Sequence, residues 1–229
     1  MKTDSHIILI VAAHTDDETL GLGGTIAKHV SNGDKVFALS MTDGVSSRSK
    51  VTNKEINSRI QASLLSSKIL GFEWLENNNF PDNQLDTIPF LEIVKFIEYW
   101  KNKIKPKIIY THSYSDLNID HQIVSRATLT AFRPKAEEIW EEIRSFEIPS
   151  STDYSHNHLS GKFNPNLYIN IKDQWSKKLE ALNCYRDELM TYPNSRSLNK
   201  IKNLAEFRGG ESGLELAEAF EIIRKIVRN

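Results

Sequence analysis

The chain has 229 residues, 39% of them hydrophobic, and a formal net charge of −1. A charge this close to zero argues against non-specific nucleic-acid binding, which needs an excess of Lys and Arg. No apolar stretch reaches the ~18 residues that a membrane span requires, and the first strand begins without a signal-peptide segment. We therefore expect a cytoplasmic protein without a membrane span, folded as a single domain over residues 1–229.

Strand and helix patterns alternate along the first half of the chain. Strands are predicted at residues 7–13, 35–41, 72–75 and 107–111, and helices at residues 19–30, 53–70 and 90–104, with another starting near His121. This alternation predicts an α/β fold with a parallel, doubly wound sheet. Later in the chain we expect strands at residues 146–149 and 166–171 and helices at residues 174–190 and 214–227.

Charged side chains crowd the end of the first predicted strand, at His14, Asp16, Asp17 and Glu18. The glycines that follow suggest a phosphate-binding turn, but Ile26 occupies the place of the third glycine and the acids would repel a phosphate. A metal site fits better, with His14 and Asp17 as ligands and Asp16 placed to handle a proton. The simpler alternative is that Asp16 or Asp17 only caps the following helix.

A second cluster follows the strand at residues 107–111 and contains Asp116, Asn118, Asp120 and His121. Two histidines and one carboxylate, with positions left for water, are typical of catalytic rather than structural zinc sites. Iron, cobalt or nickel also bind such a set. Asp120 either orients a ligand imidazole or caps the helix, and the sequence favours neither. The single cysteine, Cys184, excludes a thiolate-rich zinc site and an intrachain disulfide.

The motifs resemble those of a known family. The segment His14-Thr15-Asp16-Asp17-Glu18 resembles the His-Pro-Asp-Asp-Glu signature of the LmbE-like, or PIG-L, deacetylases, and residues 116–121 resemble their second metal motif. Weaker matches are Arg59, residues 80–82, residues 208–209 and residues 217–220. The resemblance implies a Rossmann-like fold and zinc-dependent removal of an acetyl group from an amino sugar or its conjugate. It also favours a homo-oligomer, although no motif specifies one.

Carried over by position, the resemblance implies that His14, Asp17 and His121 bind one zinc ion and that Asp16 is the general base. It implies a substrate contact for Arg59. Asn118 stands where some members have a histidine that steadies the oxyanion; an amide donates a neutral hydrogen bond but is no cationic acid. An amide is hydrolysed by attack on its carbonyl and stabilisation of the resulting oxyanion, which a zinc site performs.

Other polar residues carry weaker signals. Glu147 interrupts an apolar run and suits binding of sugar hydroxyls, but an alternating, half-exposed strand explains it equally. His156 and His158 lie in a polar loop at residues 152–161, long enough to cover the site, although loop histidines are usually solvated. We therefore expect a zinc-dependent N-deacetylase with a small-molecule substrate. The alternatives are a metal-dependent amidase on a non-sugar acyl amine and a catalytically silent sugar- or metal-binding protein.

Overall fold

The computed structural model describes residues 5–47, 52–76, 80–157 and 161–228, and within them the strands form one seven-stranded sheet. The strand order is β3-β2-β1-β4-β5-β7-β6. Neighbours from β3 to β5 are parallel, whereas β7 runs antiparallel to both β5 and β6. This confirms the predicted, mostly parallel α/β sheet. The strands are β1 (Ile7–Ala12), β2 (Lys35–Ser40), β3 (Glu73–Trp74), β4 (Ile108–His112), β5 (Glu142–Phe146), β6 (Leu167–Asn170) and β7 (Ala217–Lys225).

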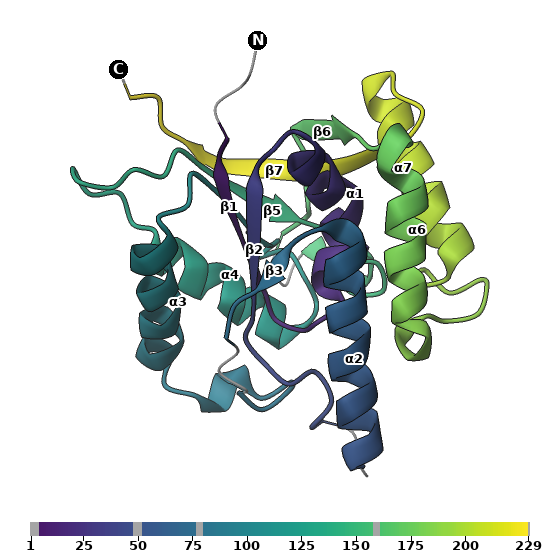
Figure 1. The fold of residues 1–229 in the computed structure, drawn as a ribbon, viewed down its shortest axis with the longest axis horizontal. Helices are drawn as coiled ribbons and strands as arrows, with labels where there is room; N and C mark the ends of the chain where they lie inside the picture. Colours follow the sequence, from purple (N-terminus) through teal and green to yellow (C-terminus); the bar gives the residue numbers. More distant parts are fainter. Residues whose placement is uncertain (1–4, 48–51, 77–79, 158–160, 229) are drawn as a thin grey trace.

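Helices cover both faces of the sheet (Figure 1). Helices α3 (Phe90–Ile104) and α4 (Ile119–Ala131) pack on one face. Helices α1 (Asp17–Ser31), α2 (Asn53–Leu70), α6 (Trp175–Cys184) and α7 (Leu198–Ser212) pack on the other. Within the described residues, no helix has both the length and the apolarity needed to cross a bilayer.

Strand β1 lies in the interior of the sheet, between β2 and β4, and is buried on both faces. Leu9 and Val11 belong to the core beneath α3 and α4, while Ile8 and Ile10 belong to the core beneath α1 and α6. Successive side chains of a strand point to opposite faces, so a strand between two helical layers must be apolar at every position. The continuous run at residues 7–13 follows from this placement.

The order of the strands reverses beside β1, and this reversal positions the site. From β1 the chain crosses to β2 on one side and later returns to β4 on the other side of β1. In open α/β sheets such a switch point opens a crevice beyond the carboxyl ends of the strands, where ligands bind. The polar segments that follow β1 and β4 therefore meet at one edge of the sheet.

The glycines after the first acidic cluster allow close packing of α1. A Cβ atom on Gly21 would lie 2.6 Å from Phe146, and one on Gly24 would lie 2.7 Å from Ile171. Helix α1 is also kinked at Leu22, and the buried Glu218 carboxylate accepts hydrogen bonds from the freed N–H groups just beyond the kink. These glycines let α1 pack closely against its neighbours, which agrees with the interpretation that they do not form a phosphate-binding turn.

The sequence-based expectations were wrong near the C-terminus. Residues 214–227 were expected to be helical, but residues 217–225 form β7, and helix α7 was not expected at all. Strand β5 covers residues 142–146 rather than 146–149, and the helix expected to reach residue 190 ends at Cys184, before a 3-10 turn at Arg186–Glu188. The residues of β7 favour helix locally, but pairing with β5 and β6 overrides that preference.

Candidate active site

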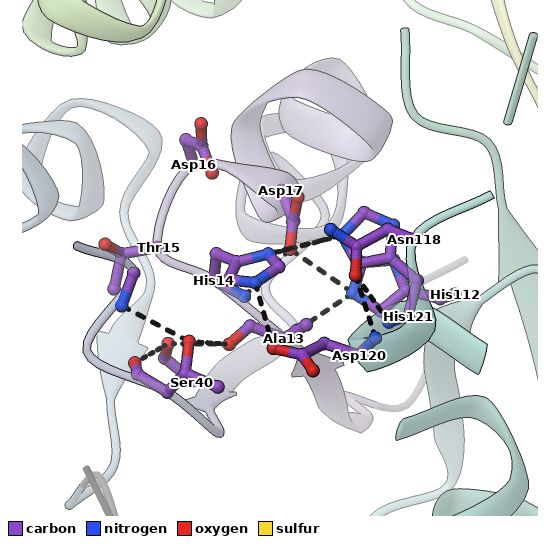
Figure 2. Close-up of polar contacts among 12 residues, drawn as sticks. Ala13, His14, Thr15, Asp16, Asp17, Ser40, His112, Asn118, Asp120 and His121 are labelled. Atoms are coloured by element: carbon purple, nitrogen blue, oxygen red, sulfur yellow. Dashed lines mark hydrogen bonds and ion pairs between the residues drawn. The ribbon is translucent and has the colours of Figure 1, made fainter. Parts of the chain in front are cut away.

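Three side chains from separate elements converge at the switch point (Figure 2). His14 follows β1, Asp17 begins α1, and His121 lies in the first turn of α4. His14 Nδ1 lies 3.2 Å from both Asp17 Oδ2 and His121 Nε2, and the last two atoms are 3.5 Å apart. Ligands about 2.0–2.1 Å from a tetrahedral zinc ion are separated by roughly 3.3–3.4 Å. The three atoms therefore form a triangle of the size that one metal ion requires.

The second nitrogen of each of these histidines faces carboxylates. His121 Nδ1 lies 3.1 Å from Asp116 Oδ2. His14 Nε2 lies 3.1 Å from Asp82 Oδ1 and 3.4 Å from Asp120 Oδ2. Such contacts fix the tautomer and the orientation of a metal-binding imidazole. Asp120 thus lies beside a histidine of the triangle, and Asp116, to which the sequence analysis gave no role, lies beside the other.

The electrostatics of the cluster favour a cation. Burial alone would raise the pKa of the Asp17 carboxyl, but His121, His112 and His14 hold it well below its usual range. Burial would likewise lower the pKa of His121, yet Asp17 and Asp116 outweigh it and raise this pKa to about 9. In the described part of the chain, the buried Asp17 Oδ1 atom has no hydrogen-bond partner. The donor set, its spacing and this orphaned oxygen all fit a divalent ion.

His112, a third histidine of this cluster, is fully buried at the end of β4. Its Nε2 atom accepts a 2.9 Å hydrogen bond from the backbone N–H of Ala13, so that lone pair is already used. The ring stacks on His121 at a centroid distance of 3.9 Å. Burial, together with the charge of His121, lowers the pKa of His112 to about 4 and keeps the ring neutral. His112 therefore packs behind the triangle, with Nε2 3.3 Å from Asp17 Oδ2 but already engaged by Ala13.

Asp16 is set apart from the triangle on the loop before α1 (Figure 2). Its φ of 147° is one that residues other than glycine rarely adopt, and its side chain makes no capping hydrogen bond to α1. Instead, Oδ1 lies 2.9 Å from Arg59 Nη2, and Oδ2 lies 3.4 Å from Arg196 Nη1. Burial raises the pKa of Asp16, while the two guanidinium groups limit the rise. This geometry does not support a simple helix cap.

Asn118 does act as the cap of α4. Its Oδ1 atom accepts hydrogen bonds from the backbone N–H groups of Asp120 (2.8 Å) and His121 (3.4 Å). Its Nδ2 atom donates to Asn83 Oδ1 at 3.0 Å. The amide therefore fixes the start of the helix that carries His121 and keeps one further N–H for another acceptor. Asp120 was the residue considered as a cap near His121, and Asn118 fills this position instead.

These residues surround an open cavity of about 220 Å³, which we call the catalytic cavity. Of the residues with predicted roles, His14, Asp16, Arg59, Asn118 and His121 line it. Every lining residue except Gly44 has a polar side chain. The remaining ones are Ser47, Asp82, Asn83, Ser150, Ser151, Glu188 and Arg196.

Two of the remaining candidate residues, Glu147 and His156, do not line the catalytic cavity. Both carboxylate oxygens of Glu147 accept 2.7 Å hydrogen bonds from Arg208, and Glu147 is not among the described residues that line the catalytic cavity. Its role in substrate binding stays a prediction, which this ion pair does not favour. His158 lies outside the described residues, and His156 is exposed and likewise does not line the catalytic cavity.

Comparison with known proteins agrees with this geometry. The model of the family described as "PIG-L: GlcNAc-PI de-N-acetylase" matches residues 9–132, more than half of the chain and the segment that contains the triangle. The chain belongs to the PIG-L family of deacetylases. A PIG-L relative, the "uncharacterized deacetylase YaiS" of Escherichia coli K12, is 29% identical over 185 residues, which cover 76% of this chain and 88% of that protein.

Solved structures share the fold of this PIG-L protein. The N,N'-diacetylchitobiose deacetylase of Pyrococcus horikoshii matches with a TM-score of 0.73 and 22% identity, covering 96% of this chain and 85% of that one. GalB, the 4-carboxy-2-hydroxymuconate hydratase of Pseudomonas putida KT2440, matches with a TM-score of 0.76 and 18% identity, covering 98% of each chain. A deacetylase and a hydratase thus share this architecture, so the reaction must be argued from the site.

The chain departs from the PIG-L signature at Thr15, and this residue contacts Arg59. Thr15 stands in the place of the signature's proline, and its Oγ1 atom accepts a 2.9 Å hydrogen bond from Arg59 Nε. The other side of the same guanidinium pairs with Glu188 at 2.7 Å. Arg59 is thus held on three sides, by Thr15, Asp16 and Glu188. These contacts fix the Arg59 guanidinium against the Asp16 carboxylate, and we call them the Arg59 clamp.

Proposed function

We propose that the protein is a zinc-dependent N-deacetylase that releases acetate from an N-acetylated amino sugar or glycoconjugate. The observation that carries the proposal is the triangle of His14, Asp17 and His121 beside a buried aspartate in an almost entirely polar cavity. The family supports deacetylation.

His14, Asp17 and His121 would hold one divalent ion, and their two imidazoles and one carboxylate suit zinc. Such an ion, when bound, polarises the amide carbonyl and lowers the pKa of water to roughly 7. Asp116, Asp82 and Asp120 keep the two imidazoles oriented through their second nitrogens.

Asp16 acts as the general base in this proposal. It takes a proton from the attacking water as the new C–O bond forms, and returns it to the amide nitrogen as the C–N bond breaks. The products are acetate and a free amine. Burial raises the pKa of Asp16 and so makes it a stronger base than an exposed aspartate. The Arg59 clamp holds its carboxylate in one orientation. The spare N–H of Asn118 is the candidate donor to the developing oxyanion.

The lining of the catalytic cavity favours a sugar over an apolar acyl amine. No apolar side chain from the described residues lines it, so it has no surface for an alkyl or aryl group. Serine hydroxyls, carboxylates, amides and the Arg196 guanidinium instead match the hydroxyl groups of a sugar ring. In the described part of the chain, the buried Arg196 Nε atom has no hydrogen-bond partner.

The test is a panel of N-acetylated sugars, free, nucleotide-linked and lipid-linked, with an N-acetylated polar amine that is not a sugar. We expect amine and acetate to appear in equal amounts from at least one sugar, and release to stop on chelation and resume on adding Zn²⁺. Release only from the non-sugar amine would identify an amidase. Tight glycan binding without any release would identify a silent binding protein.

A further inference from the structure

Glu18 is a buried carboxylate that follows the aspartates of the site. It lies in the first turn of α1 and is 0% exposed. It is not among the described residues that line the catalytic cavity, and none of its atoms belongs to the triangle. Burying a carboxylate is unfavourable unless hydrogen bonds compensate for the lost water. The groups that contact Glu18 therefore indicate what it does.

Three donors converge on the Glu18 carboxylate, and one of them is the backbone of the proposed general base. The N–H of Asp16 donates a 2.9 Å hydrogen bond to Oε2. The hydroxyl groups of Thr19 and Tyr185 donate to Oε1, at 2.6 Å and 2.9 Å. Both oxygens are thus engaged by protein groups, which holds the carboxylate in one orientation.

The hydrogen bond from Asp16 acts at a point of unusual backbone conformation. Asp16 has a φ of 147° and a ψ of −25°, and it directly precedes the first turn of α1. A residue other than glycine keeps such angles only where its surroundings hold it there. The N–H groups at the start of a helix have no partner within the helix itself. Glu18 supplies the acceptor for this one.

The groups that hold Glu18 come from the two helices that also hold the Asp16 side chain. Ser66 of α2 lies with its hydroxyl 2.8 Å from the threonine hydroxyl that donates to Glu18. Tyr185 follows α6, and the Cζ atom of Arg59, another residue of α2, lies 5.4 Å from the centroid of its ring. The backbone and the carboxylate of Asp16 are therefore fixed to one framework.

We propose that Glu18 is a positioning residue for deacetylation, which acts through the backbone N–H of Asp16 to aim the general base at the attacking water. The inference rests on the proposed function for the role of Asp16. An acceptor at the position of Oε2 is sufficient, so the role does not depend on the charge of Glu18. Without that acceptor, the backbone of Asp16 relaxes and its carboxylate turns away from the water, while the triangle keeps its ion.

The first test compares E18M with E18Q. E18M has no oxygen to accept from Asp16, and kcat should fall by about 10- to 100-fold, since a misplacement of about 1 Å costs up to ~10²-fold. KM and zinc content should not change. The amide oxygen of E18Q still accepts from Asp16, so its kcat should stay within about threefold of wild type. Loss of zinc in E18M, a rise in KM at constant kcat, or an equally slow E18Q would overturn the proposal.

The second test is a double-mutant cycle with D16N. Because Glu18 acts through Asp16, adding E18M to D16N should lower kcat by less than about twofold further, whereas independent roles would multiply the two losses. The matched control is E218Q, because Glu218 is another buried carboxylate that accepts backbone N–H groups of α1. It should keep the wild-type kcat. A 10-fold loss or more in E218Q, or on adding E18M to D16N, would reduce Glu18 to general support of α1.

The amide proton of Asp16 provides a readout without catalysis. In wild type and E18Q labelled with ¹⁵N-aspartate, this proton should exchange slowly with solvent, and in E18M at least about tenfold faster. Urea unfolding identifies the variants that fold. Rapid exchange of this proton in wild type would overturn the proposal even if E18M does not fold. A protected proton that E18M releases, in a protein that frees no acetate from the substrate panel, would reject the proposed function alone.

Discussion

The backbone N–H of Ala13 donates a 2.9 Å hydrogen bond to Nε2 of His112. This bond gives His112 a different role from His121, the histidine stacked on it. His112 has its lone pair occupied and is buried at the strand end. His121, stacked against it, keeps Nε2 directed at His14 and Asp17. The contact joins β1 to β4, the two strands whose ends carry the site.

This difference predicts opposite effects on metal content. H121A should lose the ion while staying folded, because one corner of the triangle is gone. H112Q should retain about one ion per chain, since the glutamine amide oxygen reaches the position of Nε2 and can still accept from Ala13. Metal analysis of the purified variants, with circular dichroism to confirm folding, measures both. Full occupancy in H121A, or loss of the ion in H112Q, would reverse the assignment.

The Arg59 clamp predicts a loss in turnover rather than in binding. R59M should lower kcat by about 10²-fold, the scale expected when a catalytic group is misplaced by about 1 Å, with KM little changed. R59K should recover part of the loss by restoring the charge beside Asp16. R126M is the control, because Arg126 lies against Phe90. A rise in KM at constant kcat would instead make Arg59 a substrate contact, as the resemblance implied.

The two roles of Asn118 can be separated by substitution. N118A should lower the free energy of unfolding by ~1 kcal/mol through loss of the α4 cap, whereas N118S should preserve the cap. Both should lower kcat, because neither side chain has the amide donor, by an amount equivalent to ~1–3 kcal/mol. Steady-state kinetics and urea unfolding supply the two readouts. Wild-type kcat in N118S would leave capping as the residue's whole role.

The packing role of the α1 glycines predicts opposite stability changes for two alanine substitutions in helices. G24A should destabilise the protein by ~1–3 kcal/mol, because the new Cβ would lie 2.7 Å from Ile171. G210A, in α7, has no atom within 4 Å of its Cβ and should be neutral or stabilising by up to ~1 kcal/mol. Urea unfolding compares the two. Unchanged stability in G24A would contradict the close-packing interpretation.

Much of the fold could be predicted because the N-terminal elements carry unambiguous local patterns. The buried run of β1 and the helices at Asn53–Leu70 and Phe90–Ile104 combine apolar periodicity with clear end signals, such as Gly71 with its φ of 88°. Strand β7 could not be recognised because Ala217 and Ala219 favour helix locally. Pairing with β6, which holds these two residues, and with β5, which is distant in sequence, makes the segment a strand.

The site could be predicted only in part, for a similar reason. His14, Asp17 and His121 lie in short motifs that can be read locally. The partners that hold them come from distant segments: Asp82 reaches His14, and Arg59 and Arg196 reach Asp16. Asp116 lies five residues before His121, and its motif could have revealed its role.

The central claim is that a metal held by the triangle and a proton transfer by Asp16 together perform deacetylation. The most direct measurement is acetate release by metal-free wild type and D16N protein during titration with Zn²⁺, on a substrate identified by the panel. Wild type should gain activity in proportion to bound ion, up to one per chain. D16N should bind the same ion and remain about 10²–10⁴-fold slower. Acetate release by the metal-free protein, or wild-type turnover in metal-loaded D16N, would contradict the account.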